Sequence, residues 1–331
     1  MQKIRWGVLS TAKIARTQLI PAMFRAENAE VVAIASRGSK VHAVASELTI
    51  PKAYESYDEL INDPEIDAVY IPLPNHLHKE WVFKAAEQGK HILCEKPVSI
   101  NVEEAMEMVA FCRKKNVKFM EAFMYQFHPQ HGRVREIISS GEIGEVKLIK
   151  SSHSFYFENR NGNIRMNKEM GGGSVYDIGC YSIHAIRHVL QTEPIEVHVY
   201  AEMDKESEVD TSAFGYLKLE NGVNATFDCS FDMFGRNEYE VVGTKGTILV
   251  PYAFRPDING GVGHVIVKNN SGITRDEKIY GDIYRLEVEH FSQSIISDKA
   301  PLYSGQSAIE NMKVIDACYE SISSGTAVKV N

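Results

Sequence analysis

Short apolar runs alternate with amphipathic helical patterns along the first third of the chain. This order is typical of successive βαβ units, which build a parallel sheet covered by helices. Such a sheet holds its ligand at the carboxyl ends of its strands. The pattern predicts strands at Ile4–Leu9, Val31–Ala35, Ala68–Ile71, His91–Cys94 and Lys118–Ala122, and helices at Lys13–Ala26, Lys40–Leu48, His78–Gln88 and Val102–Lys115.

The second half of the chain has a different pattern, in which several runs alternate apolar and polar residues. A period of two places the apolar side chains on one face, so a sheet with one buried face is expected. No repeat or linker separates the two patterns, and the domain boundary is placed near residue 122. The expected strands are Val146–Phe157, Glu196–Met203, Ala213–Leu219, Val223–Phe231, Glu238–Val242 and Thr247–Val250.

Composition narrows the class of protein. The length of 331 residues corresponds to about two domains. With 36 basic and 44 acidic residues the net charge is −8, which argues against nucleic acid as a partner. No apolar run approaches the ~20 residues of a membrane span, and no signal peptide is evident. The five cysteines are scattered, as in proteins with reduced thiols, so a cytoplasmic protein is expected.

The first strand–helix turn is where a dinucleotide-binding fold carries its glycine fingerprint. In the hexapeptide 10–15 all the glycine positions hold Ser or Ala. Small residues still let the backbone approach a pyrophosphate, and the helix N-terminus offers unpaired N–H groups. An ordinary strand–helix turn is the alternative. The candidate cofactor-binding residues here are Ser10, Thr11, Ala12, Lys13 and Ile14.

The end of the second strand bears on the choice of coenzyme. NAD-binding proteins usually place an acidic residue there, which holds the ribose 2′-hydroxyl. This chain has Ser36 and Arg37 instead, and an arginine can bind a 2′-phosphate through two hydrogen bonds. NADP is therefore favoured over NAD if the domain binds a dinucleotide, and a solvated basic turn is the alternative.

The triplet Glu95-Lys96-Pro97 directly follows a predicted strand. It resembles the hallmark of the glucose–fructose oxidoreductase, inositol dehydrogenase and rhizopine catabolism family (Gfo/Idh/MocA). Other segments agree with that family in order and spacing, and the resemblance covers essentially the whole chain. These segments are 74–78 (Pro-Asn-His-Leu-His), 121–125 (Glu-Ala-Phe-Met-Tyr), 171–173 (three Gly), 177–181 (Asp-Ile-Gly-Cys-Tyr) and 243–247 (Gly-Thr-Lys-Gly-Thr).

The resemblance implies an α/β fold with two domains. Residues 1–122 would form a Rossmann-type dinucleotide-binding domain. Residues 123–331 would form a substrate-binding α/β domain with a large, open, mainly antiparallel sheet, whose outer face would make a homodimer or homotetramer. The resemblance also implies further cofactor-binding residues, of which Arg165 could instead pair with Glu169 four residues on. These residues are Pro74, Asn75, His78, Glu95, Lys96 and Arg165.

Oxidising a secondary alcohol needs a base for the hydroxyl proton and a nearby hydride acceptor. Asp177, Tyr181, His184 and His188 are spaced 4, 3 and 4 residues apart, which places them on one face of a helix. Burying such polar groups without partners is costly, so the stripe needs an explanation.

The tyrosine in this motif resembles the family branch that includes NADP-dependent xylose dehydrogenases and dihydrodiol dehydrogenases. That branch implies Tyr181 as the catalytic acid/base, with Asp177 as an orienting group. Lys96 would be its partner, because a nearby cation lowers the pKa of a tyrosine. A core tyrosine with a satisfied hydroxyl is the alternative interpretation of Tyr181.

The expected substrate contacts come from both domains. They are Lys96, Phe155, Asp177, Tyr181 and His184, although a plain core histidine explains His184 equally well. The set Asp177, His184 and His188 and the pair His128/His131 could suggest zinc, but neither has a cysteine cluster or a metalloenzyme signature, so no metal is expected.

The sequence predicts an oxidoreductase that transfers a hydride between NADP(H) and a sugar, a polyol or a related cyclic alcohol. The same residues serve oxidation and reduction, so the direction stays open. The alternative hypothesis is a non-catalytic regulator that senses a sugar or a cofactor on the same fold. The presence of both Lys96 and Tyr181 favours the enzyme.

Overall fold

The computed structural model describes residues 2–331, which form two compact units. One unit comprises the chain up to Phe123 together with Tyr284–Ile309, and the other comprises Met124–Ile283 and Glu310–Asn331. The predicted division at residue 122 is therefore incomplete, because a later segment returns to the first unit. Packing explains the return: Trp6 Nε1 donates a hydrogen bond to Ser292 Oγ at 3.2 Å, and Asn28 Nδ2 donates to the carbonyl of Glu289 at 2.9 Å.

The first unit contains a six-stranded parallel sheet with the order β3-β2-β1-β4-β5-β6. This is the strand order of dinucleotide-binding folds, whose ligand lies where the order reverses between β1 and β4. β4 is buried along its whole length, as expected for a parallel sheet with helices on both faces. The strands are β1 (Ile4–Leu9), β2 (Ala29–Ala35), β3 (Lys52–Tyr54), β4 (Ala68–Ile71), β5 (His91–Glu95) and β6 (Phe119–Ala122).

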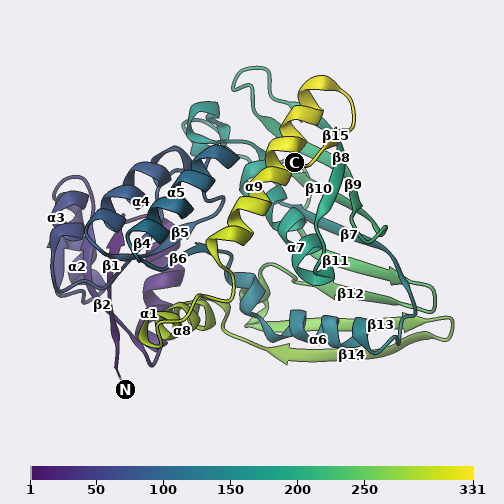
Figure 1. Ribbon diagram of the computed structural model, residues 1–331, viewed down its shortest axis with the longest axis horizontal. Coiled ribbons are helices and arrows are strands. Elements are labelled where there is room, and N and C mark those ends of the chain that lie inside the picture. Colours follow the sequence, from purple (N-terminus) through teal and green to yellow (C-terminus); the bar gives the residue numbers. More distant parts are fainter. Residues whose placement is uncertain (1) are drawn as a thin grey trace. The chain divides into compact units, whose positions relative to one another are not determined.

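The four predicted helices of this unit are present in the predicted order, and α3 and α8 are additional. The predicted helix 13–26 contains a π-helical turn, Ala15–Leu19, in which the N–H of Ile20 bonds to the carbonyl of Ala15. The next residue, Pro21, has no N–H to donate. Figure 1 shows α4 and α5 side by side. The helices are α1 (Ile20–Arg25), α2 (Lys40–Glu47), α3 (Tyr57–Asn62), α4 (His78–Glu87), α5 (Val102–Lys114) and α8 (Ile283–Ile296).

The second unit is built on a nine-stranded sheet with the order β14-β13-β12-β11-β7-β10-β9-β8-β15. Every pair is antiparallel except β7 with β10, which confirms the predicted mainly antiparallel sheet. The strands are β7 (Val146–Ser154), β8 (Pro194–Met203), β9 (Asp210–Leu219), β10 (Asn224–Ser230), β11 (Arg236–Gly243), β12 (Thr247–Pro251), β13 (Val262–Asn269), β14 (Gly272–Tyr280) and β15 (Val328–Lys329).

Helices cover one face of this sheet. In Figure 1, α6 (Pro129–Ser139) lies along β13 and β14, and α7 (Cys180–Leu190) lies over β7. The helix α9 (Gly305–Ser324) joins the two units, and its residue Ser321 accepts a hydrogen bond from the backbone N–H of Val199 at 3.0 Å. Along β9, residues alternate between buried and exposed from Ala213 to Leu219, so the other face of the sheet is open.

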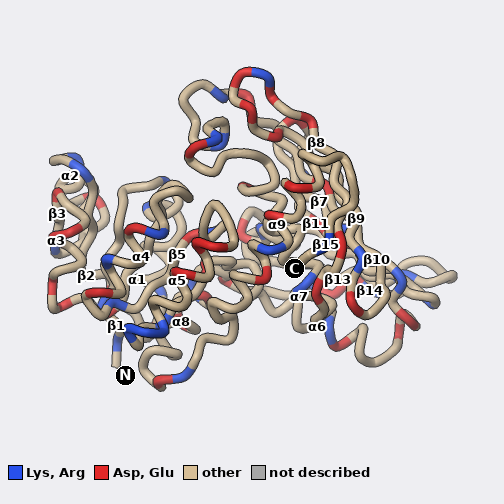
Figure 2. Tube along the Cα trace, turned by 45° about the horizontal axis from the view of Figure 1, so that its top comes forward, with Lys and Arg blue, Asp and Glu red and all other residues tan. Residues whose placement is uncertain are grey.

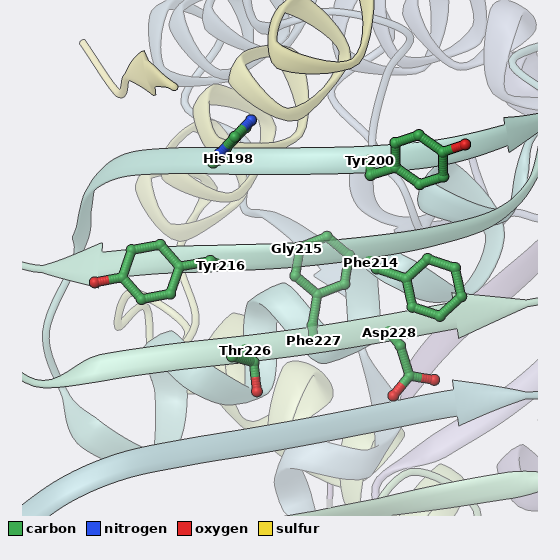
Figure 3. Close-up of a pocket in the computed structure, with 8 residues that line it drawn as sticks. All are labelled: His198, Tyr200, Phe214, Gly215, Tyr216, Thr226, Phe227 and Asp228. Atoms are coloured by element: carbon green, nitrogen blue, oxygen red, sulfur yellow. The ribbon is translucent and has the colours of Figure 1, made fainter. Parts of the chain in front are cut away.

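The open face carries exposed aromatic side chains. Figure 3 shows Tyr200, Phe214 and Tyr216 projecting from β8 and β9 around a shallow pocket of about 420 Å³. These three side chains are 72%, 39% and 42% exposed. A contiguous aromatic surface of this kind is typical of an interaction site rather than of a solvated face.

Charges are mixed in both units. Figure 2 shows Lys and Arg interspersed with Asp and Glu along the chain. All five cysteines are buried and unpaired with one another. No helix within residues 2–331 is both long and apolar enough to cross a membrane.

Candidate active site

The turn after β1 adopts a glycine-like backbone without glycine. Ser10 has a φ of +151°, a value that glycine reaches freely and other residues rarely. Its Oγ accepts a hydrogen bond from the N–H of Ala12 at 3.0 Å, which fixes the turn. Lys13 and Ile14 follow in the first helical turn, where backbone N–H groups lack intrahelical partners. The arrangement fits a pyrophosphate at this turn.

The end of β2 fits a phosphate better than a ribose hydroxyl. Thr11 Oγ1 donates to Ser36 Oγ at 3.5 Å, so the turns after β1 and β2 lie beside each other. Arg37 is exposed and forms no ion pair with any described residue. A guanidinium without a carboxylate partner can bind a 2′-phosphate through two hydrogen bonds.

The loop after β4 contains Pro74, Asn75 and His78, and His78 is held by the backbone. The side chain is fully buried, its Nε2 lies 2.8 Å from the carbonyl of Leu73, and its Nδ1 lies 3.1 Å from the carbonyl of Val98. Burial lowers the pKa of His78 to about 4. Its imidazole ties this loop to the loop that follows β5, and a contact of His78 with the cofactor stays a prediction.

At the end of β5, Glu95 is held by two neighbours. Its Oε1 accepts a hydrogen bond from the hydroxyl of Tyr70, and its Oε2 accepts one from the backbone N–H of Lys96 at 3.3 Å. A second carboxyl group from α8, Glu287, is buried nearby, and burial together with the charge of Glu95 raises the pKa of Glu287 well above its usual value. Sequence reasoning missed Glu287, since it is distant in the chain from every motif.

In the second unit, Arg165 and Asp177 form an ion pair that the sequence analysis did not expect. Arg165 Nε donates to Asp177 Oδ2 at 2.5 Å, which replaces the pairing considered between Arg165 and Glu169. The guanidinium lies 5.8 Å from the ring centre of Phe155 and 6.0 Å from that of Phe157. Its pKa is raised mainly by the charge of Asp177, with a smaller contribution from Tyr181. Three predicted residues, Phe155, Arg165 and Asp177, are thus in one cluster.

Tyr181 lies on the first turn of α7 within an aromatic cage. Its ring is 5.3 Å from His153, 5.6 Å from Phe254 and 5.8 Å from Tyr125, measured between ring centres. Its hydroxyl contacts the sulfur of Met124 at 3.6 Å, and a thioether is only a weak acceptor. The side chain is 7% exposed, so the aromatic cage fixes the orientation of the ring.

Behind Tyr181 the polar stripe of α7 continues into the core. His184 is 3% exposed, and the hydroxyl of Tyr125 lies 2.6 Å from its Nδ1. His188 stacks on His184 with ring centres 5.8 Å apart, and it lies 2.9 Å from the guanidinium of Arg135. Burial lowers the pKa of both histidines, which keeps the imidazoles neutral. This environment fits the core role considered for His184, and a contact of His184 with the substrate stays a prediction.

A buried carboxylate that the sequence analysis missed holds the start of this helical segment. Asp210 Oδ2 accepts hydrogen bonds from the hydroxyl of Ser174 at 2.6 Å and from the N–H of Val175 at 2.7 Å. Its Oδ1 accepts one from the hydroxyl of Tyr319 at 2.8 Å. A Cβ on Gly173, which has a φ of +117°, would lie 2.2 Å from Asp210 Oδ1, so glycine is required there. Asp210 thereby positions the segment that carries Asp177 and Tyr181.

The histidines considered for a metal site have partners within the protein. His128 Nε2, just before α6, lies 3.1 Å from the carbonyl of Gly261, and His131 Nδ1 in α6 lies 2.9 Å from the hydroxyl of Tyr239. Within the described residues, 2–331, no group of three or more His, Cys, Asp or Glu side chains is arranged to hold a metal ion.

Comparison with known proteins defines the class to which this fold and site belong. Residues 4–123 match the oxidoreductase family with an NAD-binding Rossmann fold, and residues 131–249 match the GFO/IDH/MocA C-terminal domain. The chain belongs to the Gfo/Idh/MocA oxidoreductase family.

Individual members of the family are similar over nearly the whole chain. The D-xylose 1-dehydrogenase (NADP(+)) 2 of Haloferax volcanii is 37% identical over 327 residues, which cover 98% of this chain and 99% of that protein. An aldose-aldose oxidoreductase from Caulobacter crescentus, solved with glycerol, has a TM-score of 0.90 at 25% identity and covers 99% of this chain and 100% of its own.

A third relative is known as a complex with its coenzyme. It is a 3-ketoreductase from Actinomadura kijaniata, solved with NADP and TDP-benzene, with a TM-score of 0.90 at 27% identity over 97% of this chain and 98% of its own. Structures of that 3-ketoreductase also exist for a tyrosine-to-phenylalanine variant and for a lysine-to-alanine variant.

Proposed function

We propose that this protein is an NADP-dependent dehydrogenase or reductase of a sugar, a polyol or a related cyclic alcohol. The observation that carries the proposal is Tyr181 at the start of α7, one helical turn beyond an Asp177 carboxylate that Arg165 holds. The similar enzymes named above, a xylose dehydrogenase, an aldose-aldose oxidoreductase and a 3-ketoreductase, support the substrate class.

Tyr181 is the proposed general acid/base. In the oxidative direction its oxygen takes the hydroxyl proton of the substrate, while the C–H bond breaks and its electron pair leaves with the hydrogen. The nicotinamide supplies the two-electron acceptor for that hydride. A tyrosine has an ordinary pKa of about 10, so a nearby cation is needed to favour its deprotonated form near neutral pH.

Lys96 is the proposed cationic partner of Tyr181. It follows β5 at the edge where a parallel sheet holds its ligand, and it belongs to the Glu-Lys-Pro motif of the family. Glu95 then belongs to the nicotinamide ribose site, where Tyr70 orients its carboxylate.

Asp177 is the proposed orienting group. Its Oδ2 is engaged by Arg165, which fixes the carboxylate, so it can accept a hydrogen bond from a substrate hydroxyl. Phe155 lies beneath the guanidinium and restricts its motion. Arg165 therefore acts through Asp177 in this proposal, and not as a direct ligand of the cofactor.

NADP is the proposed coenzyme. The 2′-phosphate is assigned to Ser36 and Arg37, and the pyrophosphate is assigned to the turn Ser10–Ile14. The absence of an acidic residue after β2 argues against NAD. Five buried thiols fit a reducing cytoplasm, which is the proposed location.

The open face of the nine-stranded sheet is the proposed homo-oligomer surface, as a dimer or tetramer. The exposed rings of Tyr200, Phe214 and Tyr216 support this assignment, because burying them against a second copy removes apolar surface from water (Figure 3).

A coenzyme and turnover screen tests the proposed function. NADPH and NADH are titrated by fluorescence, and sugars and polyols are then assayed with the preferred coenzyme. Tight NADPH binding with turnover of at least one sugar is expected. Coenzyme binding without turnover of any sugar or polyol would support the regulator instead, and no binding of either coenzyme would refute the NADP-dependent enzyme.

A further inference from the structure

A pocket of about 500 Å³ lies in the second unit at the ends of β7, β11 and β12. It is termed the distal pocket here, and its lining includes His153, Phe155, Arg236, Glu238, Tyr252 and Arg255. Its volume falls within the roughly 300–1,000 Å³ typical of small-molecule sites. The pocket is separate from the aromatic pocket on the open face of the sheet, which is lined by residues of β8, β9 and β10.

Two lining residues also contact the candidate catalytic groups of the same unit. His153 packs edge-to-face against the ring of Tyr181, with ring centres 5.3 Å apart. Phe155 lies 5.8 Å below the guanidinium of Arg165, which holds Asp177. One side chain, His153, therefore separates the distal pocket from Tyr181, and two, Phe155 and Arg165, separate it from Asp177.

The cations of the distal pocket are already neutralised. Arg255 binds Asp257 through two hydrogen bonds, Nε to Oδ1 at 2.9 Å and a terminal nitrogen to Oδ2 at 2.7 Å. Arg236 is bound in the same way by Asp228, and its Nε donates to Ser154 Oγ at 3.1 Å. Glu238 adds a carboxylate to the lining. These charged groups give no excess of positive charge, so the pocket lacks the electrostatics that a diphosphate needs.

The chemistry that remains suits an uncharged ring with several hydroxyl groups. Phe155 and Tyr252 offer aromatic surface to the apolar face of such a ring. The guanidinium N–H groups can donate to its hydroxyls, and Glu238 can accept from them. The backbone beside the pocket is held by Asn237, whose Oδ1 accepts from the N–H groups of Phe254 and Arg255 at 2.7 and 3.1 Å.

We propose that the distal pocket binds a second, neutral sugar ring, so that the substrate is a disaccharide or glycoside whose reacting ring lies at Tyr181. This inference rests on the proposed function and specifies its substrate class. It predicts that this protein, unlike enzymes that act on nucleotide-linked sugars, does not prefer a substrate that carries a diphosphate.

Substrate selectivity tests the inference. Turnover is measured with D-xylose and D-glucose, with xylobiose and cellobiose, and with UDP-glucose as the anionic probe. At least one two-ring substrate is expected to have a kcat/KM tenfold or more above that of its single ring, with UDP-glucose no better than the single ring. The variants Tyr252→Ala and Glu238→Gln are expected to lower the two-ring to single-ring ratio at least tenfold. The control Tyr200→Ala, on the open face, is expected to keep that ratio.

The outcomes separate this inference from the proposed function. Single-ring turnover with no two-ring preference, or a preference for UDP-glucose, overturns the distal pocket assignment and leaves the oxidoreductase standing. If no sugar is turned over, binding of xylobiose and cellobiose is measured by calorimetry. Binding that Tyr252→Ala weakens tenfold then supports the pocket while the proposed function fails, and no binding overturns both.

Discussion

Arg165 Nε lies 2.5 Å from Asp177 Oδ2, so a charged group from the turn Ile164–Met166 holds the carboxylate that precedes Tyr181 by one helical turn. Arg165 is itself placed locally, because the side chain of Asn163 accepts a hydrogen bond from its backbone N–H at 3.0 Å. The orientation of Asp177 therefore depends on a turn that lies outside its own helix.

This contact predicts strong coupling between the two residues. Replacing Arg165 by Ala is expected to lower kcat about as much as Asp177→Asn, because either change releases the oriented carboxylate. A double-mutant cycle on kcat/KM is expected to give a coupling free energy of about 1–3 kcal/mol, as for residues in direct contact. Additive losses would show that Arg165 acts independently of Asp177, for example on the cofactor.

Asp210 predicts a stability effect at the start of the same segment. Its carboxylate accepts three hydrogen bonds in a buried position, and an amide in Asp210→Asn cannot accept all of them. The free energy of unfolding is expected to fall by about 1–3 kcal/mol, measured by urea denaturation. The matched control Asp298→Asn, whose carboxylate is exposed, is expected to change it by less than ~0.5 kcal/mol. Equal effects of the two changes would contradict the assigned role.

Glu287 predicts a pH dependence of stability. Its pKa is raised in the folded protein by burial and then by the charge of Glu95, so the folded state retains a proton that the unfolded state has lost. The contribution of Glu287 to the free energy of unfolding is fully present below the unfolded pKa of about 4.3. It decreases as the pH rises above that value, by at most about 1.4 kcal/mol per pH unit.

The variant Glu287→Gln isolates this effect, because glutamine stays neutral at every pH. The free energy of unfolding of the variant relative to the natural protein is expected to increase steadily from pH 5 to pH 8. Other groups, such as His78 with its lowered pKa, cancel in this difference. Parallel stability curves for the two proteins would show that Glu287 does not hold a proton in the fold.

The position of Arg37 after β2 leads us to expect that it makes the protein prefer NADPH over NADH. Arg37→Ala is expected to weaken NADPH binding by roughly 10- to 150-fold, the equivalent of a charged hydrogen-bonded contact, and to leave NADH binding within twofold. Arg113→Ala, at the last turn of α5, is the control. Fluorescence titration measures both affinities, and an equal loss for both coenzymes would place Arg37 outside the 2′-phosphate site.

Local patterns predicted those parts of the fold whose apolar residues are consecutive or periodic. Strands β1 and β4 have the predicted bounds, because β4 is a short apolar run buried on both faces and β1 is buried except at Arg5. The strands β3, β13, β14 and β15 were not predicted, and the polar residues of β14 leave an edge strand with no apolar alternation to detect. The helices α3, α6, α8 and α9 were also absent from the prediction.

Site residues could be predicted where they belong to a sequence motif. They could not be predicted where their role depends on a contact between residues far apart in the chain. The segments around Lys96 and Tyr181 are recognisable in the sequence alone. The contact of Asp210 with Val175 joins residues 35 positions apart, and that of Tyr125 with His184 joins residues 59 apart. Nothing local distinguishes a histidine buried against such a partner from one that lines a pocket, which is why the sequence left both interpretations of His184 open.

The proposed role of Tyr181 as the general acid/base is tested by the variant Tyr181→Phe. The assay measures kcat with NADP+ and the best sugar of the screen, and NADPH binding by fluorescence in the same preparation. Removing the hydroxyl is expected to lower kcat about 10²- to 10⁴-fold, the usual contribution of a general acid/base, with NADPH affinity unchanged within twofold. A Tyr181→Phe protein that retains more than a tenth of the natural kcat would show that Tyr181 is not the general acid/base.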